Sequence, residues 1–227
     1  MHDEVPYQPP RRSRATRSFA ARSKSSARGF LFAHLPAQER PRQIIYESNL
    51  ERRVLLTFLA RPDLADIWDQ PPAIQYVSGT GALRQHTPDF LATLRTGVRL
   101  AIAVKPLPSV ERLRFKEELS FVRIGMSPAY ADDLLLVTDA DLNDAAVRNA
   151  ELLHIARQTV DADARQAISE MLAGLAAAKT VADILAESGL AHRGWAALIC
   201  AIHEGEAGID PGRRIGSQTL LYPRGGK

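Results

Sequence analysis

Two strand-like runs joined by a short turn restrict most strongly how this chain can fold. Residues 87–94 and 98–105 are rich in apolar and β-branched side chains, and Arg95-Thr96-Gly97 between them has the composition of a tight turn. The pattern predicts a β-hairpin. A hairpin alone is marginally stable, so these strands are expected to belong to a larger sheet covered by helices.

The hairpin brings an acidic and a basic residue together. A turn centred near Thr96 places Asp89 opposite Ala103, Val104 or Lys105. Side chains alternate along a strand, so Ala103 and Lys105 share a face. We therefore predict that Asp89 and Lys105 meet on one face of the hairpin.

A helix is predicted over residues 49–60, where apolar residues recur at helical spacing. Ser48 is a favourable N-cap, and Glu51 three residues later completes a capping-box pattern. Arg61-Pro62 ends the helix. Glu51 flanks the apolar stripe and is expected to point toward the sheet, and Glu47 would approach the same region if the helix began earlier.

The remaining signals before residue 160 indicate an α/β fold with a mixed sheet flanked by helices. Residues 67–77, with Pro71-Pro72 inside, predict a strand at a sheet edge. Ser109 is expected to cap a helix that runs to about Val122. Residues 133–138 read as a buried parallel strand after this crossover, and a helix follows over 144–157.

The last third of the chain is predicted to be a separate helical domain. Helices are expected over 164–178, 180–188 and 195–203, followed by a hairpin within 206–223. Three helices and a hairpin are the order of a winged helix, in which Arg213-Arg214 of the wing could contact phosphate or form a solvated turn. The predicted division is a flexible basic arm over 1–28, an α/β domain over 29–160 and a winged-helix-like domain over 161–227.

Positive charge is concentrated near the N-terminus. The net charge is +3, but residues 11–28 contain no acid and seven basic side chains, namely Arg11, Arg12, Arg14, Arg17, Arg22, Lys24 and Arg28. A basic arm of this kind binds polyanions by releasing counterions, so DNA contact is expected. A solvated tail or a targeting stretch is the alternative.

Composition excludes several other classes. Cys200 is the single cysteine, which rules out a disulfide framework or a cysteine-based zinc site within the chain. The sequence shows no hydrophobic signal segment and no apolar run of membrane-spanning length, so a cytoplasmic location is expected.

Asp89, Lys105 and Glu51 together suit metal-assisted phosphodiester hydrolysis. Hard carboxylate oxygens bind Mg²⁺ or Mn²⁺, the metal acidifies bound water, and a lysine stabilises the transition state. Each residue alone has a simpler explanation: Glu51 as a capping residue, Asp89 as a surface acid and Lys105 as a strand-end lysine. His86 is close in sequence and could touch phosphate, although a surface role is the simpler interpretation.

Several short motifs occur in an order that resembles the TnsA endonucleases of heteromeric transposases, members of the PD-(D/E)XK superfamily. They are Tyr46-Glu-Ser-Asn-Leu-Glu51 on a helix, Gln70-Pro71 before a strand, Thr87-Pro-Asp89-Phe90, and Ala101-Ile-Ala-Val-Lys105-Pro106. The resemblance covers roughly residues 29–140 and extends more weakly to the C-terminal part. It implies a restriction-endonuclease-like fold with a C-terminal winged-helix-type domain.

The resemblance also implies a site. By position, the catalytic residues fall on Glu51, Asp89 and Lys105, and Mg²⁺ or Mn²⁺ would be held by Glu51, Asp89 and the backbone carbonyl of Val104. One departure stands out. Most PD-(D/E)XK enzymes have an acid two residues before the lysine, and TnsA-like proteins have glutamine there in some cases, whereas this chain has Ala103.

Three hypotheses follow. The first is a metal-dependent endonuclease that cuts the 5′ strands at transposon ends, with a TnsB-type DDE transposase and a TnsC-type AAA+ ATPase as implied partners. The second is a weak or inactive adaptor of the same fold, which docks the transposase, the ATPase and DNA. The third is a different PD-(D/E)XK nuclease, such as a restriction or repair enzyme.

Overall fold

The computed structural model describes residues 8–16, 27–36, 38–159, 161–210 and 212–225. The chain divides into two compact units, one within residues 1–58 and 63–141 and the other within 59–62 and 142–227. The division therefore falls after residue 141 rather than near 160, because Leu153 and Ala156 of the helix over 144–156 belong to the core of the second unit.

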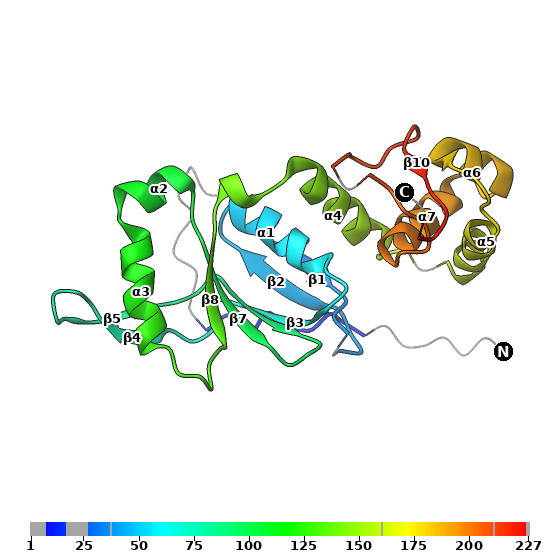
Figure 1. Ribbon diagram of the computed structural model, residues 1–227. Coiled ribbons are helices and arrows are strands. Elements are labelled where there is room, and N and C mark those ends of the chain that lie inside the picture. The colour runs from blue at the N-terminus through cyan, green and yellow to red at the C-terminus, as the bar shows by residue number, and fades with distance from the viewer. Residues whose placement is uncertain (1–7, 17–26, 37, 160, 211, 226–227) are drawn as a thin grey trace. The chain divides into compact units, whose positions relative to one another are not determined.

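The first unit contains most of the strands (Figure 1). Its elements are β1 (Gly29–Ala33), β2 (Arg42–Tyr46), α1 (Asn49–Leu59, whose last residue belongs to the second unit), β3 (Leu64–Asp69), β4 (Ile74–Val77), β5 (Leu83–His86), β6 (Phe90–Leu94), β7 (Arg99–Val104), α2 (Leu107–Arg112), α3 (Phe115–Gly125), β8 (Asp133–Val137) and the 3-10 turn η1 (Asp139–Asp141).

A four-stranded mixed sheet forms the centre of this unit, in the order β3-β6-β7-β8. β6 pairs antiparallel with β7, with Phe90 opposite Ile102, which confirms the predicted hairpin. β8 lies parallel to β7, as predicted, but it is the edge strand of this sheet, and of its residues only Leu134 is buried. β1–β2 and β4–β5 form two separate two-stranded sheets. The unit is thus an α/β structure with a mixed sheet flanked by helices.

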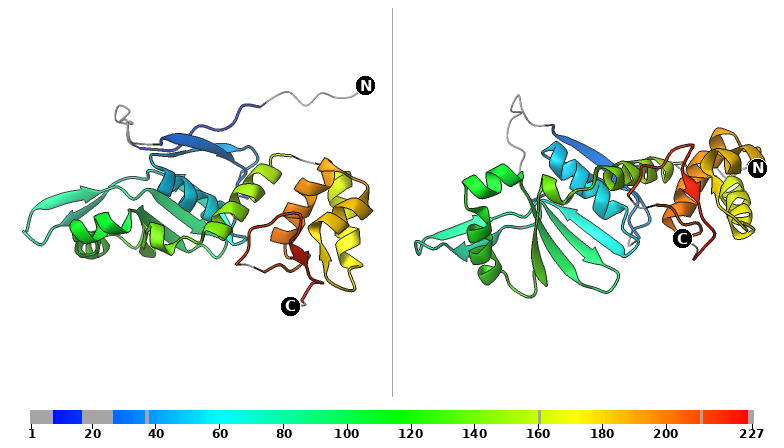
Figure 2. Two further views of the ribbon diagram at one scale, coloured as in Figure 1. Left: turned by 90° about the horizontal axis from the view of Figure 1, so that it is seen from above. Right: turned by 45° about the horizontal axis from the view of Figure 1, so that its top comes forward.

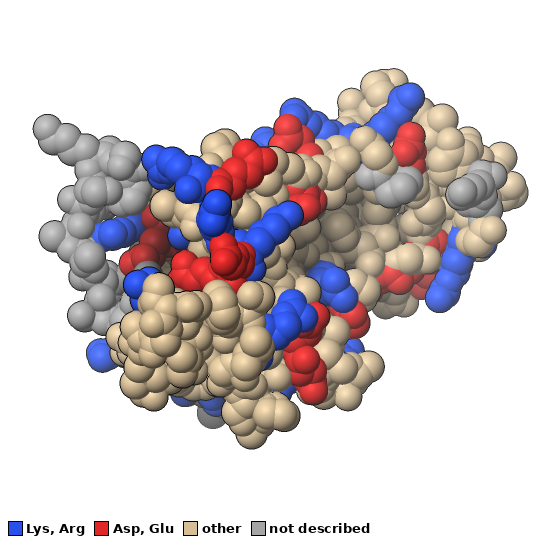
Figure 3. Space-filling model, turned by 60° about the vertical axis from the view of Figure 1, so that its left-hand side comes forward, with Lys and Arg blue, Asp and Glu red and all other residues tan. Residues whose placement is uncertain are grey.

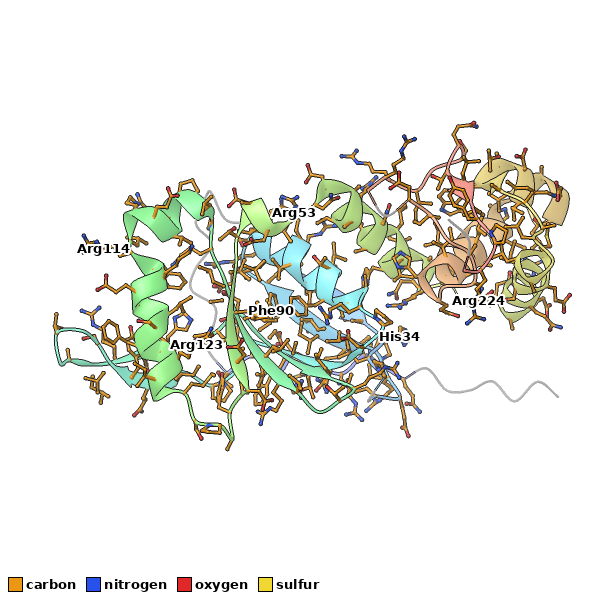
Figure 4. All side chains as sticks on the ribbon, viewed as in Figure 1. His34, Arg53, Phe90, Arg114, Arg123 and Arg224 are labelled. Carbon is orange, nitrogen blue, oxygen red and sulfur yellow. The ribbon has the colours of Figure 1, made fainter. Side chains whose placement is uncertain are left out.

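Helices cover both faces of the sheet. On one face, Ala101 and Ala103 of β7 pack with Val110 of α2 and Phe115 of α3 in a single buried cluster. Seen from above, α1 lies on the other side of the sheet (Figure 2). Phe90 lies within the body of the sheet (Figure 4) and is fully buried. Side chains of the hairpin are therefore buried on both faces of the sheet.

The helix predicted to begin at Ser109 is interrupted and begins earlier. α2 starts at Leu107 after Pro106, and its first N–H donates to Asp139 Oδ1 (2.7 Å) rather than to a capping serine. Arg114 adopts a left-handed conformation (φ 51°), which separates α2 from α3. The side chain of Arg114 points outward from this break (Figure 4).

The single strand predicted over residues 67–77 is two strands in two sheets. Gln70 has a positive φ of 46°, and Pro71-Pro72 follow it, so the main chain turns out of the central sheet after β3. The chain then enters β4, where Ile74 pairs with His86 of β5.

Residues 11–16, which we call the N-terminal strap, run across the first unit. Gln43 N donates to Arg11 O (2.9 Å), and at the other end Thr16 N donates to Gln70 O (3.0 Å). A flexible arm was expected over the whole of 1–28. These six residues are instead held by main-chain hydrogen bonds to β2 and to the end of β3.

A buried carboxylate anchors the strap. Asp69 is 0% exposed and accepts hydrogen bonds from Ser13 Oγ, Arg14 N (3.3 Å) and Ile45 N (2.9 Å). The Arg14 guanidinium also forms an ion pair with Asp66 (2.7 Å). The strap, β2 and β3 are therefore joined through these two aspartates.

The second unit is mainly helical. It contains α4 (Asp144–Ala156), α5 (Ala162–Ala173), β9 (Lys179–Thr180), α6 (Val181–Ser188), α7 (His192–His203) and β10 (Leu220–Leu221). The predicted helices are confirmed, although their ends differ by a few residues. β10 pairs antiparallel with β9, and Gly208 bridges to Tyr222, so the segment expected to form a hairpin pairs mainly with a strand before α6.

Stability of the second unit is predicted to depend on pH through Asp161, the N-cap of α5. Hydrogen bonds from the Arg193 guanidinium and from Ala164 N lower the pKa of Asp161 to about 2. A depressed pKa means that this stabilisation is present above the ordinary value of 3.8 and is lost as the pH falls toward 2. In urea unfolding followed by circular dichroism, wild type should exceed Asp161→Asn in stability at pH 6.

Asparagine is also a good N-cap, so the comparison isolates the charge of Asp161. The difference between the two proteins should shrink between pH 4 and pH 2. A difference that stays constant from pH 6 to pH 2 would show that the carboxylate charge contributes nothing.

No helix within the described residues combines the length and the apolar character needed to cross a membrane.

Candidate functional site

Asp89 lies at the end of the central sheet, one residue before β6. Its N–H donates to Ile102 O (2.8 Å), its carbonyl accepts from Gln70 N (2.9 Å), and its Oδ2 accepts from Val104 N (2.7 Å). The β6–β7 register ends at the Phe90–Ile102 pair, so Asp89 lies just beyond the last paired residue of β6. Hydrogen bonds to both neighbouring strands therefore fix the position of this carboxylate.

Lys105 follows β7 at the same end of the sheet. Its N–H donates to Val137 O (3.1 Å), and its Nζ lies over the Phe115 ring, 4.3 Å from the ring centroid. Phe115 belongs to the helices on the Ala101–Ala103 face, so Lys105 projects on that face. The next turn is also tied down, because Leu107 N donates to Asp139 Oδ1 after β8. The structure thus brings Asp89 and Lys105 to one end of two paired strands.

Val104 and Ala103 differ in what they can offer a ligand. Val104 has its N–H bonded to Asp89, and β7 is in parallel register with β8 at this residue, opposite Val137. Ala103 is 1% exposed and packs in the core with Val110 and Phe115. A longer acidic side chain at position 103 would have to displace this packing.

Glu51 performs the capping role that its sequence context suggested. Its Oε2 accepts from Glu47 N (2.6 Å), its Oε1 accepts from Ser48 Oγ (2.9 Å), and Ser48 Oγ accepts from Glu51 N (3.1 Å). The residue is 8% exposed. Because α1 lies on the face of the sheet opposite α3, the Glu51 carboxylate would have to reach past the end of the sheet to join Asp89.

A second group of polar residues, on β4, β5 and α3, was not found from the sequence as a set. His86 lies against Phe115, with ring centroids 5.8 Å apart, and Tyr76 donates to Glu118 Oε1 (2.9 Å). Burial lowers the pKa of His86, Glu118 acts to raise it, and Lys105 lowers it further. His86 is thus a partly buried imidazole biased toward its neutral form, rather than the surface histidine that was expected.

Glu118 could not be assigned to this site from sequence, because it is one of several acids on a helix of otherwise ordinary composition. Only the packing of α3 against β4 brings Glu118 to Tyr76 and into the electrostatic surroundings of His86. Burial and the hydrogen bond to Glu118 raise the pKa of Tyr76, so Tyr76 remains a hydrogen-bond donor.

The structure describes four of the seven basic residues predicted to bind DNA. Arg17, Arg22 and Lys24 lie outside the described residues. Arg11 and Arg12 are exposed at the start of the strap and remain candidates for phosphate contact.

Arg14 and Arg28 have more restricted surroundings than the basic arm implied. Arg14 is ion-paired with Asp66, donates to Ile67 O (3.2 Å) and lies 4.9 Å from the Trp68 ring centroid, so its charge is used within the first unit. Arg28 is partly buried. On the face shown in Figure 3, Lys and Arg side chains alternate with Asp and Glu, so the described atoms form no field of one sign there.

Side-chain clusters of the kind that hold metals by themselves do not occur among the described residues, since no group of three or more His, Cys, Asp or Glu is suitably placed. The expected site has only two carboxylates, with the remaining oxygens supplied by the main chain and by water. The absence of such a group among these residues means that Glu47, Glu51 and Asp89 do not form a three-carboxylate cluster.

Comparison with models of known protein families finds no match to the chain, and comparison with curated proteins also finds none.

Proposed function

We propose that this chain is a metal-dependent DNA endonuclease, the subunit of a heteromeric transposase that cuts the 5′ strands at transposon ends. The observation that carries the proposal is the placement of Asp89 and Lys105 at one end of two paired strands, with Asp89 Oδ2 held by Val104 N. An acid that can hold a divalent cation and a lysine that can stabilise negative charge both suit metal-assisted phosphodiester hydrolysis.

The architecture of the first unit supports a restriction-endonuclease-like fold. The antiparallel pair β6–β7 is extended by the parallel strand β8, α1 precedes the sheet in the chain, and α2 and α3 form the crossover to β8. In the resemblance to TnsA endonucleases, the same order of helix, hairpin, crossover and strand carries Glu51, Asp89 and Lys105.

The donor set that the resemblance implies around Asp89 would suit Mg²⁺ or Mn²⁺. Asp89 supplies a carboxylate whose orientation is already fixed, the main-chain carbonyl of Val104 is the next oxygen expected from the resemblance, and Glu51 is the third. These are hard oxygen ligands of the type that both cations prefer. When bound, the metal would acidify a water molecule and polarise the scissile phosphate.

Lys105 would stabilise negative charge on the phosphoryl oxygens during attack. Its main-chain bond to Val137 fixes the backbone at this end of the sheet, and its contact with the Phe115 ring positions the ammonium group. Lys105 and Glu118 act in opposite directions on the pKa of His86, which places His86 in the electrostatic surroundings of this lysine.

The second unit supports a winged-helix-like domain. Its order is helix α5, strand β9, helices α6 and α7, the bridging residue Gly208, and strand β10, with β10 pairing β9 and Tyr222 pairing Gly208. Asp210, Arg213 and Arg214 line a hollow of about 410 Å³ in the segment between these bridges. We propose that this domain contacts a partner of the complex, which comprises a TnsB-type DDE transposase and a TnsC-type AAA+ ATPase, and that the exposed arginines Arg11 and Arg12 contact DNA phosphate.

A second candidate, a weakly active or inactive adaptor of the same fold, is favoured by two observations. Both carboxylate oxygens of Glu51 accept hydrogen bonds in the first turn of α1. Position 103 is a core alanine that offers no side-chain ligand.

A strand-specific nicking assay tests the proposal. The full-length chain, a TnsB-type transposase and transposon-end DNA are incubated with Mg²⁺, and the two strands carry different end labels. Lys105→Ala should slow the 5′-strand cut about 10²- to 10³-fold, because it removes one charge that stabilises the transition state. The cut made by the transposase on the other strand should be unchanged.

The matched control is Lys116→Ala, an exposed lysine on α3 that should leave both cuts intact. An absent 5′-strand cut with wild type in Mg²⁺ would favour the adaptor. A Lys105→Ala protein that cuts as fast as wild type would show that the site is assigned incorrectly.

A further inference from the structure

Gln70 combines a strained main chain with a buried, unused carboxamide. It is 1% exposed and has a φ of 46°, a backbone conformation that residues other than glycine rarely adopt. Within the residues that the structure describes, neither its Oε1 nor its Nε2 has a hydrogen-bond partner. Buried polar groups normally have partners, so this carboxamide requires an explanation.

The main chain of Gln70 is, in contrast, fully bonded. Its N–H donates to Asp89 O (2.9 Å), and its carbonyl accepts from both the N–H and the Oγ1 of Thr16 (3.0 Å each). The backbone is thus fixed between the N-terminal strap and Asp89. These bonds maintain the positive φ and hold the carboxamide in place without giving it a protein partner.

Gln70 lies next to Asp89 at the end of the sheet. Asp69 pairs with Phe90 in the β3–β6 register, and the Gln70–Asp89 hydrogen bond continues that ladder by one residue. Asp89 therefore lies between the end of β3, where Gln70 N donates to its carbonyl, and β7, where Ile102 O accepts from its N–H. Ala103, on one side of Asp89, contributes only a buried methyl group, whereas Gln70, on the other side, contributes an amide oxygen.

We propose that the Gln70 carboxamide oxygen is a ligand of the divalent cation bound by Asp89. The inference rests on the proposed nuclease function. Side-chain amide oxygens are ordinary ligands of hard divalent cations. Gln70 then supplies the oxygen that position 103 lacks, from the opposite side of Asp89. Strain and an unsatisfied buried amide persist at functional sites because binding compensates for them.

The test measures Mn²⁺ binding to the full-length chain without DNA, by isothermal titration calorimetry and by electron paramagnetic resonance of the free ion. Gln70→Met replaces the amide with an apolar side chain of similar size and should weaken binding about tenfold or more. Gln70→Glu places a carboxylate there and should tighten binding by a comparable factor. Gln75, exposed on β4, is the matched control, and Gln75→Met and Gln75→Glu should bind as wild type does.

Thermal unfolding in EDTA measures the stability of each variant without bound metal. Gln70→Met removes an unsatisfied buried amide, so its midpoint should rise by about 2–4 °C although its Mn²⁺ affinity falls. If Gln70→Met fails to fold, Gln70→Asn replaces it. Asparagine tolerates positive φ and withdraws the oxygen by one methylene, so weaker Mn²⁺ binding is again expected.

Asp89→Asn separates the two proposals. If Asp89→Asn loses Mn²⁺ binding while folded Gln70→Met or Gln70→Asn binds as tightly as wild type, the role of Gln70 is refuted and the nuclease proposal stands. If wild type does not bind Mn²⁺, or binds it equally well without the Asp89 carboxylate, the nuclease site itself is refuted and the role of Gln70 with it.

Discussion

Asp89→Asn is expected to reduce the 5′-strand cut by at least about 10³-fold, because several kcal/mol of transition-state stabilisation depend on the metal. The asparagine oxygen can still accept the hydrogen bond from Val104 N, so the end of the hairpin should keep its geometry. The change therefore removes charge with little effect on the fold. Single-turnover cleavage of end-labelled DNA, with thermal unfolding of the same protein, measures both quantities.

Glu111→Gln is the matched control, because Glu111 is an exposed acid on α2, the helix that begins two residues after Lys105. It should cut at the wild-type rate. Cleavage by Asp89→Asn within a few fold of wild type would place the metal, or the chemistry, elsewhere in the chain.

Asp69→Ala is expected to destabilise the first unit by about 2–4 kcal/mol, the largest effect on stability that the structure predicts. Asp69 is fully buried and accepts hydrogen bonds from Ser13 Oγ, Arg14 N and Ile45 N. Alanine would leave these donors without an acceptor and open a small cavity. Urea unfolding followed by the fluorescence of Trp68, the residue before Asp69, should report this loss of stability.

Ser13→Ala provides the graded comparison. It removes one of the three donors and should cost only about 1 kcal/mol. If Asp69→Ala were no more destabilising than Ser13→Ala, the strap would not be anchored through this carboxylate. Hydrogen exchange at Ile45, which donates to Asp69, should accelerate in Asp69→Ala and remain near wild type in Ser13→Ala.

The sequence was most informative where structure is determined locally. The β6–β7 hairpin follows from turn residues and apolar runs within a short segment, and the pairing of Asp89 with the Lys105 end of β7 follows from that register. The capping contacts of Ser48 and Glu51 are likewise local. The mixed sheet flanked by helices could also be predicted, because an apolar run after a helical crossover is typical of a strand parallel to the one before the crossover.

Features that depend on distant contacts could not be predicted. The division of residues 67–77 into two strands depends on the positive φ of Gln70, which bonds to Asp89 and Thr16. Asp139 replaces Ser109 at the start of α2 because β8 ends beside that helix. Arg14, counted as part of a DNA-binding arm, turns inward to Asp66, an acid more than fifty residues away.

The second unit includes residues 59–62, which come from within the sequence span of the first. Ala60 packs against its core, and Leu59 O accepts a hydrogen bond from Arg157 Nη1 (2.8 Å). A fragment beginning at residue 142 would lack Leu59 and Ala60. A fragment ending at residue 141 would retain Leu59 without the second-unit residues that it contacts. The second unit therefore cannot be exchanged between proteins at a single junction. A chimera would have to transfer both of its segments, residues 59–62 and 142–227, together.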